Sequence, residues 1–314
     1  DFATAGAANY VTREMVPQNI VQSAGGSFNT QRHLFITSPF RERFRTLFAG
    51  EFYYTDGPYD FVNRNTRYNG LAKLTFDPSA TSQLNVTFTQ HYGRWNGSGQ
   101  IPLREVEANR LDRFGSLDPS EGGKSVRSTG RLDYHYDLPN GGTAFARLWA
   151  QYYYLSLFTN FTFFLNDPVN GDGIEQTDRR WLTGSDIGYR QIFRLLDYEG
   201  TMTAGLQTRF DKIQVRLGTQ QKRSSLAITQ ESDIFEASYS PYLKLDLQFL
   251  PWLRFAGGGR VDVFTYNVND RCGTDCSVRP NGTASDSIAS GKANLVFGPC
   301  AGTEFFMNAG TGFH

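Results

Sequence analysis

The stretch TAFARLWAQYYYLSLF, residues 143–158, decides the fold, because two kinds of side chain alternate along it. Successive side chains of a β-strand point to opposite faces of the sheet. One parity is mixed and carries Arg147 and Gln151, whereas the other is apolar and rich in tyrosine. This pattern is typical of a strand that crosses a bilayer, with lipid on one face, water on the other and aromatic residues at the interface. The apolar parity holds Ala144, Ala146, Leu148, Ala150, Tyr152, Tyr154 and Phe158.

The same alternation recurs along most of the chain, and within these segments every charged residue lies on one parity. A basic side chain on a lipid-facing position at mid-depth costs roughly 2–4 kcal/mol, which explains why the apolar parity excludes charge. The alternation persists for about 10–15 residues, whereas strands of soluble proteins usually run about 5–6. The clearest examples are residues 83–92, 126–138, 242–249, 253–263 and 289–297.

Composition agrees with an all-β membrane protein. The formal net charge is 0, so an acidic partner such as nucleic acid is not indicated. The mean hydropathy is −0.44 and no run of about 18 apolar residues occurs, which excludes a bundle of transmembrane helices. The chain has 26 Phe and 16 Tyr but only 3 Met, and aromatic residues between glycine-rich turns suit a membrane barrel.

The pattern predicts about 13 strands, joined alternately by short and long connections. Outer-membrane barrels have short periplasmic turns and long external loops, so the long connections are expected outside. The long connections are residues 95–124, 159–180, 211–233 and 268–285. The predicted strands are residues 19–27, 30–38, 45–55, 66–77, 82–94, 125–138, 143–158, 181–195, 199–210, 234–249, 252–267, 286–297 and 304–310.

Three stretches resemble TonB-dependent outer-membrane receptors. DFATAGAANYVTR, residues 1–13, looks like the end of the plug domain of this family, which leads into the first barrel strand. RFGSLDPSEGG, residues 113–123, resembles an external loop of one branch, and GTEFFMNAGTGFH, residues 302–314, looks like a strand of the same branch. The resemblance implies a plug end at residues 1–13, followed at 14–314 by the N-terminal part of a barrel. The chain would then be a partial, open section of a 22-stranded antiparallel up-and-down β-barrel.

The resemblance also implies a function, namely active uptake of a scarce nutrient, above all a ferric siderophore or another iron chelate. The expected partners are the TonB–ExbB–ExbD complex, reached through the N-terminal part of the receptor, the metal-chelate ligand and outer-membrane lipids. A passive channel or an outer-membrane enzyme with a complete barrel of about 12–14 strands is the alternative. No catalytic triad, phosphate-binding loop or cofactor pattern is found, so neither enzymatic activity nor a cofactor is expected.

Aromatic and basic residues at predicted loop ends are the candidate ligand-binding residues, because arginine beside aromatic rings suits planar anionic chelates. The competing interpretation is the aromatic girdle of a membrane barrel. A second set of arginines lies on the polar parity and is expected to line the lumen or to pair with plug carboxylates. The loop-end set is Tyr92, Arg94, Trp95, Arg180 and Trp181, and the lumen set is Arg127, Arg131, Arg147, Arg254 and Arg260.

Cys272 and Cys276 lie in a polar stretch that is predicted to be an external loop. A small disulfide suits the oxidising compartment that the rest of the chain implies, and half of a metal site is the alternative. The four histidines lie on separate predicted strands without metal-ligand spacing, so no metal site is expected.

Overall fold

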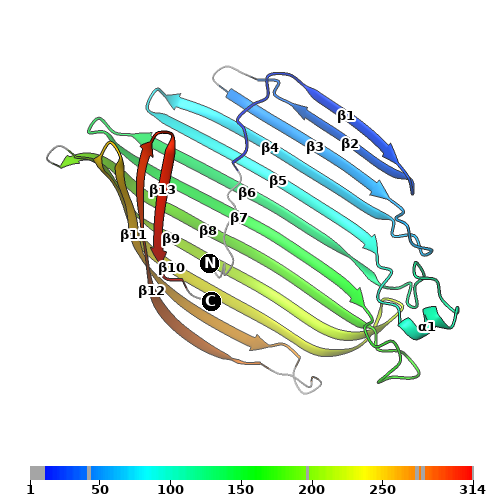
Figure 1. Cartoon of the computed structure of the whole chain (residues 1–314). Coiled ribbons are helices and arrows are strands. Elements are labelled where there is room, and N and C mark those ends of the chain that lie inside the picture. The colour runs from blue at the N-terminus through cyan, green and yellow to red at the C-terminus, as the bar shows by residue number, and fades with distance from the viewer. Residues whose placement is uncertain (1–10, 41–43, 196–197, 273–275, 277–279, 313–314) are drawn as a thin grey trace.

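A computed structural model of the chain describes residues 11–40, 44–195, 198–272, 276 and 280–312. They form one strongly curved sheet whose strands follow one another in sequence order from β1 to β13 (Figure 1). All neighbouring strands pair antiparallel, and no second layer covers either face of the sheet in the described part of the chain. The sheet does not close, so β1 and β13 are its two edges.

The elements are β1 Ile20–Gly26, β2 Thr30–Thr37, β3 Phe44–Thr55, β4 Asn65–Ser79, β5 Ser82–Asn96, α1 Leu103–Glu107, β6 Gly122–Asp137, β7 Gly142–Thr159, β8 Ile174–Leu195, β9 Tyr198–Gln221, β10 Ser224–Leu250, β11 Leu253–Asp270, β12 Gly282–Cys300 and β13 Thr303–Gly310. Among the described residues, no helix has the length and apolar character that a membrane crossing requires. The fold predicted from the alternation, an all-β up-and-down sheet of 13 strands, is therefore confirmed.

One predicted loop is wrong. Residues 211–233 form the outer ends of β9 and β10 rather than a long loop, and only Lys222 and Arg223 separate the two strands. Both residues have a positive φ, of 51° and 67°, which is the backbone of a two-residue hairpin turn. The alternation of apolar and polar residues is weak here because water covers both faces of the hairpin beyond the membrane. The backbone hydrogen bonds between the two strands continue without it.

The sheet is apolar on its convex face and polar on its concave face. Leu243 is 50% exposed on the convex side, whereas Asp262 and Ser240 are 0% and 1% exposed on the concave side. The Tyr242 hydroxyl donates a hydrogen bond to Asp186 at 2.8 Å, from β10 to β8 across the intervening β9. Side chains can bridge two strand spacings in this way only where the curvature of the sheet brings them together. The polar side chains therefore lie on the concave face.

Aromatic rings form two belts on the convex face. Near the long loops Tyr68 lies 5.2 Å from Phe52, measured between ring centroids, and near the short turns Phe44 stacks on Phe76 at 4.7 Å. Phe44 and Phe52 are separated along β3 by about 27 Å, at roughly 3.4 Å per residue. Because the strands of an outer-membrane barrel are tilted, this length along the strand corresponds to the height of the apolar band. Lipid therefore covers this face.

Residues 11–19, which precede β1, run along the concave face (Figure 1). The Lys73 ammonium group donates a hydrogen bond to the backbone carbonyl of Thr12 at 3.1 Å, and Arg45 pairs with Glu14 at 2.8 Å. The predicted plug end, residues 1–13, falls largely outside the described residues, of which only 11–13 belong to it.

Candidate ligand-binding face

Most arginines of the concave face are neutralised by a carboxylate on the wall itself. Arg131 pairs with Asp133 at 2.6 Å and Arg260 with Asp262 at 2.5 Å, in each case two residues further along the same strand. Residues two apart on a strand share one face, so this spacing places a guanidinium group beside a carboxylate without help from other strands. The same face carries the pairs Arg180–Asp178, Arg209–Asp211 and Arg147–Asp186.

Arg67 on β4 and Arg127 on β6 are the exceptions in the outer half of this face. Within the described ranges, neither has a carboxylate oxygen within 4.0 Å. Both side chains are exposed to the lumen, and the Arg67 guanidinium lies over the Tyr53 ring at 4.3 Å. Their strands are two spacings apart, so the two charges lie on the order of 10 Å from each other. Among the described residues, these two guanidinium groups thus face the lumen without a carboxylate partner.

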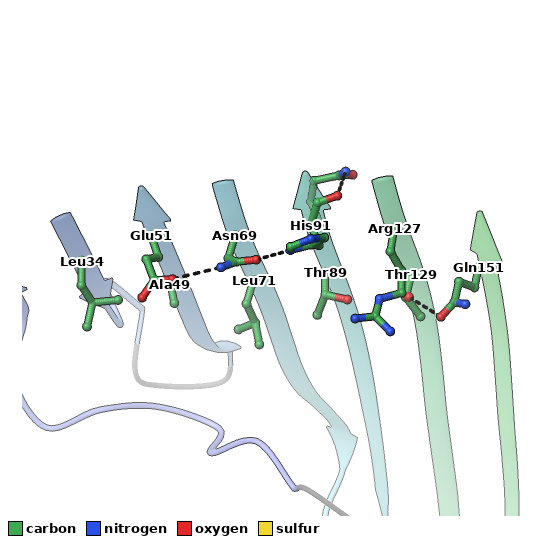
Figure 2. A pocket seen from close by; sticks show the side chains of 13 residues that line it. Leu34, Ala49, Glu51, Asn69, Leu71, Thr89, His91, Arg127, Thr129 and Gln151 are labelled. Atoms are coloured by element: carbon green, nitrogen blue, oxygen red, sulfur yellow. Dashed lines mark hydrogen bonds between the residues drawn. The ribbon is translucent and has the colours of Figure 1, made fainter. Parts of the chain in front are cut away.

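Arg127 lines a hollow of about 500 Å³ in the concave wall, formed by β2 to β7 (Figure 2). Arg67 lies next to it, on the same face of β4 as Asn69, which lines the hollow. A chain of hydrogen bonds runs across it. Arg32 donates to Glu51 at 2.6 Å, Asn69 donates to Glu51 at 3.0 Å, and the His91 ring bonds the Asn69 amide oxygen at 2.7 Å. Arg127 follows His91 in the register of the sheet. These hydrogen bonds hold the Glu51 carboxylate away from Arg127, so the Arg127 guanidinium is available to a ligand.

This hollow can recognise an anion of moderate size. Guanidinium groups donate paired hydrogen bonds to carboxylate and other planar oxygen pairs, and the stacking of Arg67 on Tyr53 pre-orders its side chain. Thr129, which donates a hydrogen bond to Gln151 at 3.1 Å, adds neutral polar groups to the floor (Figure 2). No cluster of His, Cys, Asp and Glu in the described part of the chain could hold a metal ion.

The predicted loop-end cluster is divided between the two faces of the sheet. Trp181 is 55% exposed on the convex face and contacts the Tyr152 ring at 5.1 Å, and Tyr92 contacts Tyr68 at 6.0 Å in the same belt. Arg94 shares the parity of Tyr92, whereas Trp95 and Arg180 have the concave parity. The structure therefore does not bring the five residues together, and Tyr92 and Trp181 occupy girdle positions.

The predicted lumen arginines all have the concave parity. Arg131, Arg147 and Arg260 are held in ion pairs, Arg127 lines the hollow, and Arg254 is exposed near the turn that joins β10 to β11. Arg67, Tyr53 and Glu51 were missed. Their parity alone would have placed them in the lumen, but which arginine is left unpaired depends on contacts between strands.

Cys272 and Cys276 are joined by a disulfide, with their Cα atoms 5.6 Å apart, in the connection between β11 and β12. Such a separation is usual for a disulfide. The bond closes a small ring at the outer rim and leaves neither thiol free to bind a metal.

Three external connections interlock through Arg223, and we call this group the external clasp. The Arg223 guanidinium donates hydrogen bonds to the carbonyl oxygens of Ser120 and Glu121 at 2.6 and 2.8 Å and lies over the Phe158 ring at 5.4 Å. The Asn160 amide donates to Asp118 at 2.9 Å and ties the β7–β8 connection to the same group.

A buried carboxyl group sits inside the clasp. Glu121 is 7% exposed, and its Oε1 atom has no hydrogen-bond partner. Burial, and then the negative charge of Asp118, raise the pKa of Glu121 to about 7. Burial raises the pKa of Asp118, but hydrogen bonds from Ser120 and Asn160 outweigh burial and lower this pKa. Asp118 therefore carries the charge, and Glu121 takes up the proton.

The model of the family described as TonB dependent receptor-like, beta-barrel, matches residues 40–314. No curated protein sequence is similar enough to the chain to count as a match. The fold is similar to the ferric citrate transporter FecA in its unliganded form, with a TM-score of 0.75 and 12% identity over 92% of this chain and 42% of that one. It is also similar to the siderophore receptor PiuA from Acinetobacter baumannii, with a TM-score of 0.74 and 11% identity over 92% of this chain and 48% of that one.

A third similar structure is the ferric-catecholate import receptor Fiu from E. coli K12 in its open form, with a TM-score of 0.70 and 11% identity over 92% of this chain and 53% of that one. The chain thus spans about half the length of these structures. It belongs to the family of TonB-dependent receptor β-barrels, and its place is the bacterial outer membrane.

Proposed function

We propose that the receptor to which this chain belongs takes up an anionic metal chelate, most simply a ferric siderophore or ferric citrate, across the outer membrane. The TonB–ExbB–ExbD complex supplies the energy. Residues 1–13 are the end of the plug domain, and residues 14–314 form the N-terminal part of the barrel. The segment from Val11 to Glu14 supports this division, because it already lies on the concave face against Lys73 and Arg45.

One observation carries the choice of an anionic ligand. In the outer half of the concave face Arg67 and Arg127 lack carboxylate partners among the described residues, while their neighbours Arg32 and Arg131 are paired. Ferric citrate and ferric catecholates carry net negative charge, whereas ferric trihydroxamates are close to neutral. The unpaired guanidinium groups favour the charged chelates.

The test uses the full-length receptor in a strain that lacks other iron receptors. Growth is measured on ferric citrate, a ferric tris-catecholate or a ferric trihydroxamate as the single iron source, with and without functional TonB. Growth on an anionic chelate that requires TonB supports the proposal. Growth that is independent of TonB supports the passive channel instead.

The residues are tested by Arg127→Gln, which should weaken binding of the transported anionic chelate by about tenfold, the effect of losing one charge-assisted contact of about 1.4 kcal/mol. Arg94→Gln is the matched control, because Arg94 is also exposed and lies on the neighbouring strand with the opposite parity. Equal losses in the two variants would show that the hollow is not the binding site.

A further inference from the structure

Three cations form a row across the inner half of the concave face, and we call them the cationic row. They are Arg190 on β8, Lys244 on β10 and Lys292 on β12. In the register of the sheet Arg190 pairs with Thr203, Thr203 with Lys244, Lys244 with Gly258, and Gly258 with Lys292. The cations therefore alternate with two small residues along one line perpendicular to the strands.

The three side chains line two neighbouring hollows, and Lys244 belongs to both. Arg190 and Lys244 line a hollow of about 540 Å³ together with Arg147, His135 and the carboxylate Asp137, and Lys244 and Lys292 line a second hollow of about 270 Å³. The small side chain of Thr203 and the absence of a side chain at Gly258 leave room between the cations. The concave wall thus presents the three positive charges along two hollows that meet at Lys244.

No carboxylate of the described residues lies within ion-pair distance of any cation in the row. Asp246 stands two residues after Lys244, the spacing that neutralises Arg131 and Arg260, yet the Lys244 ammonium group lies over the Tyr242 ring at 5.0 Å instead. The wall therefore neutralises most of its arginines and leaves this row charged.

The row is separate from the hollow that Arg127 lines. In the register of the sheet, Arg127 on β6 pairs with Tyr153 on β7, and Tyr153 pairs with Arg180 on β8. Arg190 lies ten residues further along β8 than Arg180. At roughly 3.3 Å per residue the two positions on β8 are about 33 Å apart, which is more than a small chelate spans. Neighbouring cations within the row are two strand spacings apart, on the order of 10 Å, which suits a chelate with several anionic groups better than a single small ion.

We propose that the cationic row is a second anion site, which holds the anionic chelate on the periplasmic side of the lumen after it leaves Arg67 and Arg127. The inference rests on the proposed function. The inference adds a place in the transport path where three charges bind the ligand. Release of the ligand inward then begins from a bound state rather than from free diffusion.

The experiment compares binding and transport in the full-length receptor, with radioactive iron as ferric citrate or, if growth selects it, the ferric tris-catecholate. The triple variant R190Q/K244Q/K292Q should bind the chelate on de-energised cells within twofold of wild type. Its initial rate of energised uptake should fall at least tenfold. Lys212→Gln is the control, because Lys212 has the convex parity on β9 and should change neither quantity.

Three results would overturn the inference. Uptake at the wild-type rate would show that the row is not on the path, and a loss of equilibrium binding equal to that of Arg127→Gln would show one site rather than two. Wild-type uptake together with new sensitivity to vancomycin would show that the row holds plug carboxylates instead. If the wild-type receptor transports none of the chelates, the proposed function itself fails, and the inference with it.

Discussion

The guanidinium group of Arg223 donates a hydrogen bond at 2.6 Å to the carbonyl oxygen of Ser120, which lies 103 residues earlier in the chain. The contact joins the tip of the β9–β10 hairpin to the connection between β5 and β6. External loops of this kind otherwise have few apolar contacts to order them, and segments with few buried contacts open at low free energy. The clasp is therefore expected to control how firmly the outer rim is held.

Arg223→Gln should loosen this rim. The shorter amide cannot reach both carbonyl oxygens and lacks the charge that strengthens the bonds, so the β5–β6 connection should exchange its amide hydrogens at least tenfold faster. The Gly97 amide, which donates to the Glu121 carbonyl at 2.8 Å, is the reporter. Lys222→Gln changes the exposed neighbour at the same tip and should have no effect. Unchanged exchange at Gly97 in Arg223→Gln would show that the clasp does not order the loop.

The clasp should also weaken as pH rises. The pKa of Glu121 is about 7 in the closed clasp and near 4.5 when the group is free, so the closed form binds more protons between these values. The clasp is therefore most stable below pH 4.5, and its stability falls as pH rises toward about 7. Above that pH it stays lower by an amount on the order of 3 kcal/mol. Gly97 exchange, corrected for intrinsic rates, should show this fall.

Glu121→Gln supplies the control for the pH effect, because a glutamine stays neutral throughout. It should keep the clasp equally stable from pH 5 to pH 8. A variant that retained the wild-type pH dependence would assign the effect to another group.

Arg260→Gln should destabilise the barrel wall. Asp262 is completely buried and accepts hydrogen bonds from Arg260 and from the Ser240 hydroxyl at 2.6 Å, so loss of the guanidinium leaves a buried charge. Removal of one partner of such a pair costs about 3 kcal/mol or more. The temperature at which the full-length receptor loses its folded mobility in gel electrophoresis should fall clearly.

Arg131→Gln provides the comparison, since its partner Asp133 keeps 25% of its side chain exposed and water can replace the lost contact. An exposed pair of this kind contributes about 1 kcal/mol or less. Equal shifts in the two variants would contradict the difference in burial on which the prediction rests.

Leu243→Lys should impair insertion into the membrane. Leu243 is half exposed on the convex face between Tyr239 and Phe249, where a lysine costs roughly 2–4 kcal/mol. Leu71→Lys makes the same chemical change on the concave face, where Leu71 lines the hollow and water is available. The amount of folded receptor in outer-membrane fractions should drop for the first variant and stay near wild type for the second. Similar losses in both would mean that the convex face does not meet lipid.

The alternation of residues 143–158 and its repeats determined the strand count, the antiparallel order and the assignment of the two faces. These are local properties, because a strand alternates its side chains regardless of its neighbours and lipid excludes charge from one parity. The prediction failed at the β9–β10 hairpin for the same reason. Beyond the membrane no apolar face is required. Lys222 and Arg223 also lack the Asn, Asp or Gly that usually marks a two-residue hairpin turn.

The candidate site was decided by the tertiary structure. The sequence placed Arg127, Arg131 and Arg260 on the lumen side alike. Only the contacts show that the last two are paired, while Arg127 has no carboxylate partner in the part of the chain that the structure describes. It also grouped Tyr92 with Arg180, which the sheet places on opposite faces. An ion pair or an open cation depends on side chains from strands far apart in the chain, and these meet only when register and curvature are set. The chain alone thus dictates which face is wet, whereas the folded wall dictates which charges on that face remain available for a ligand.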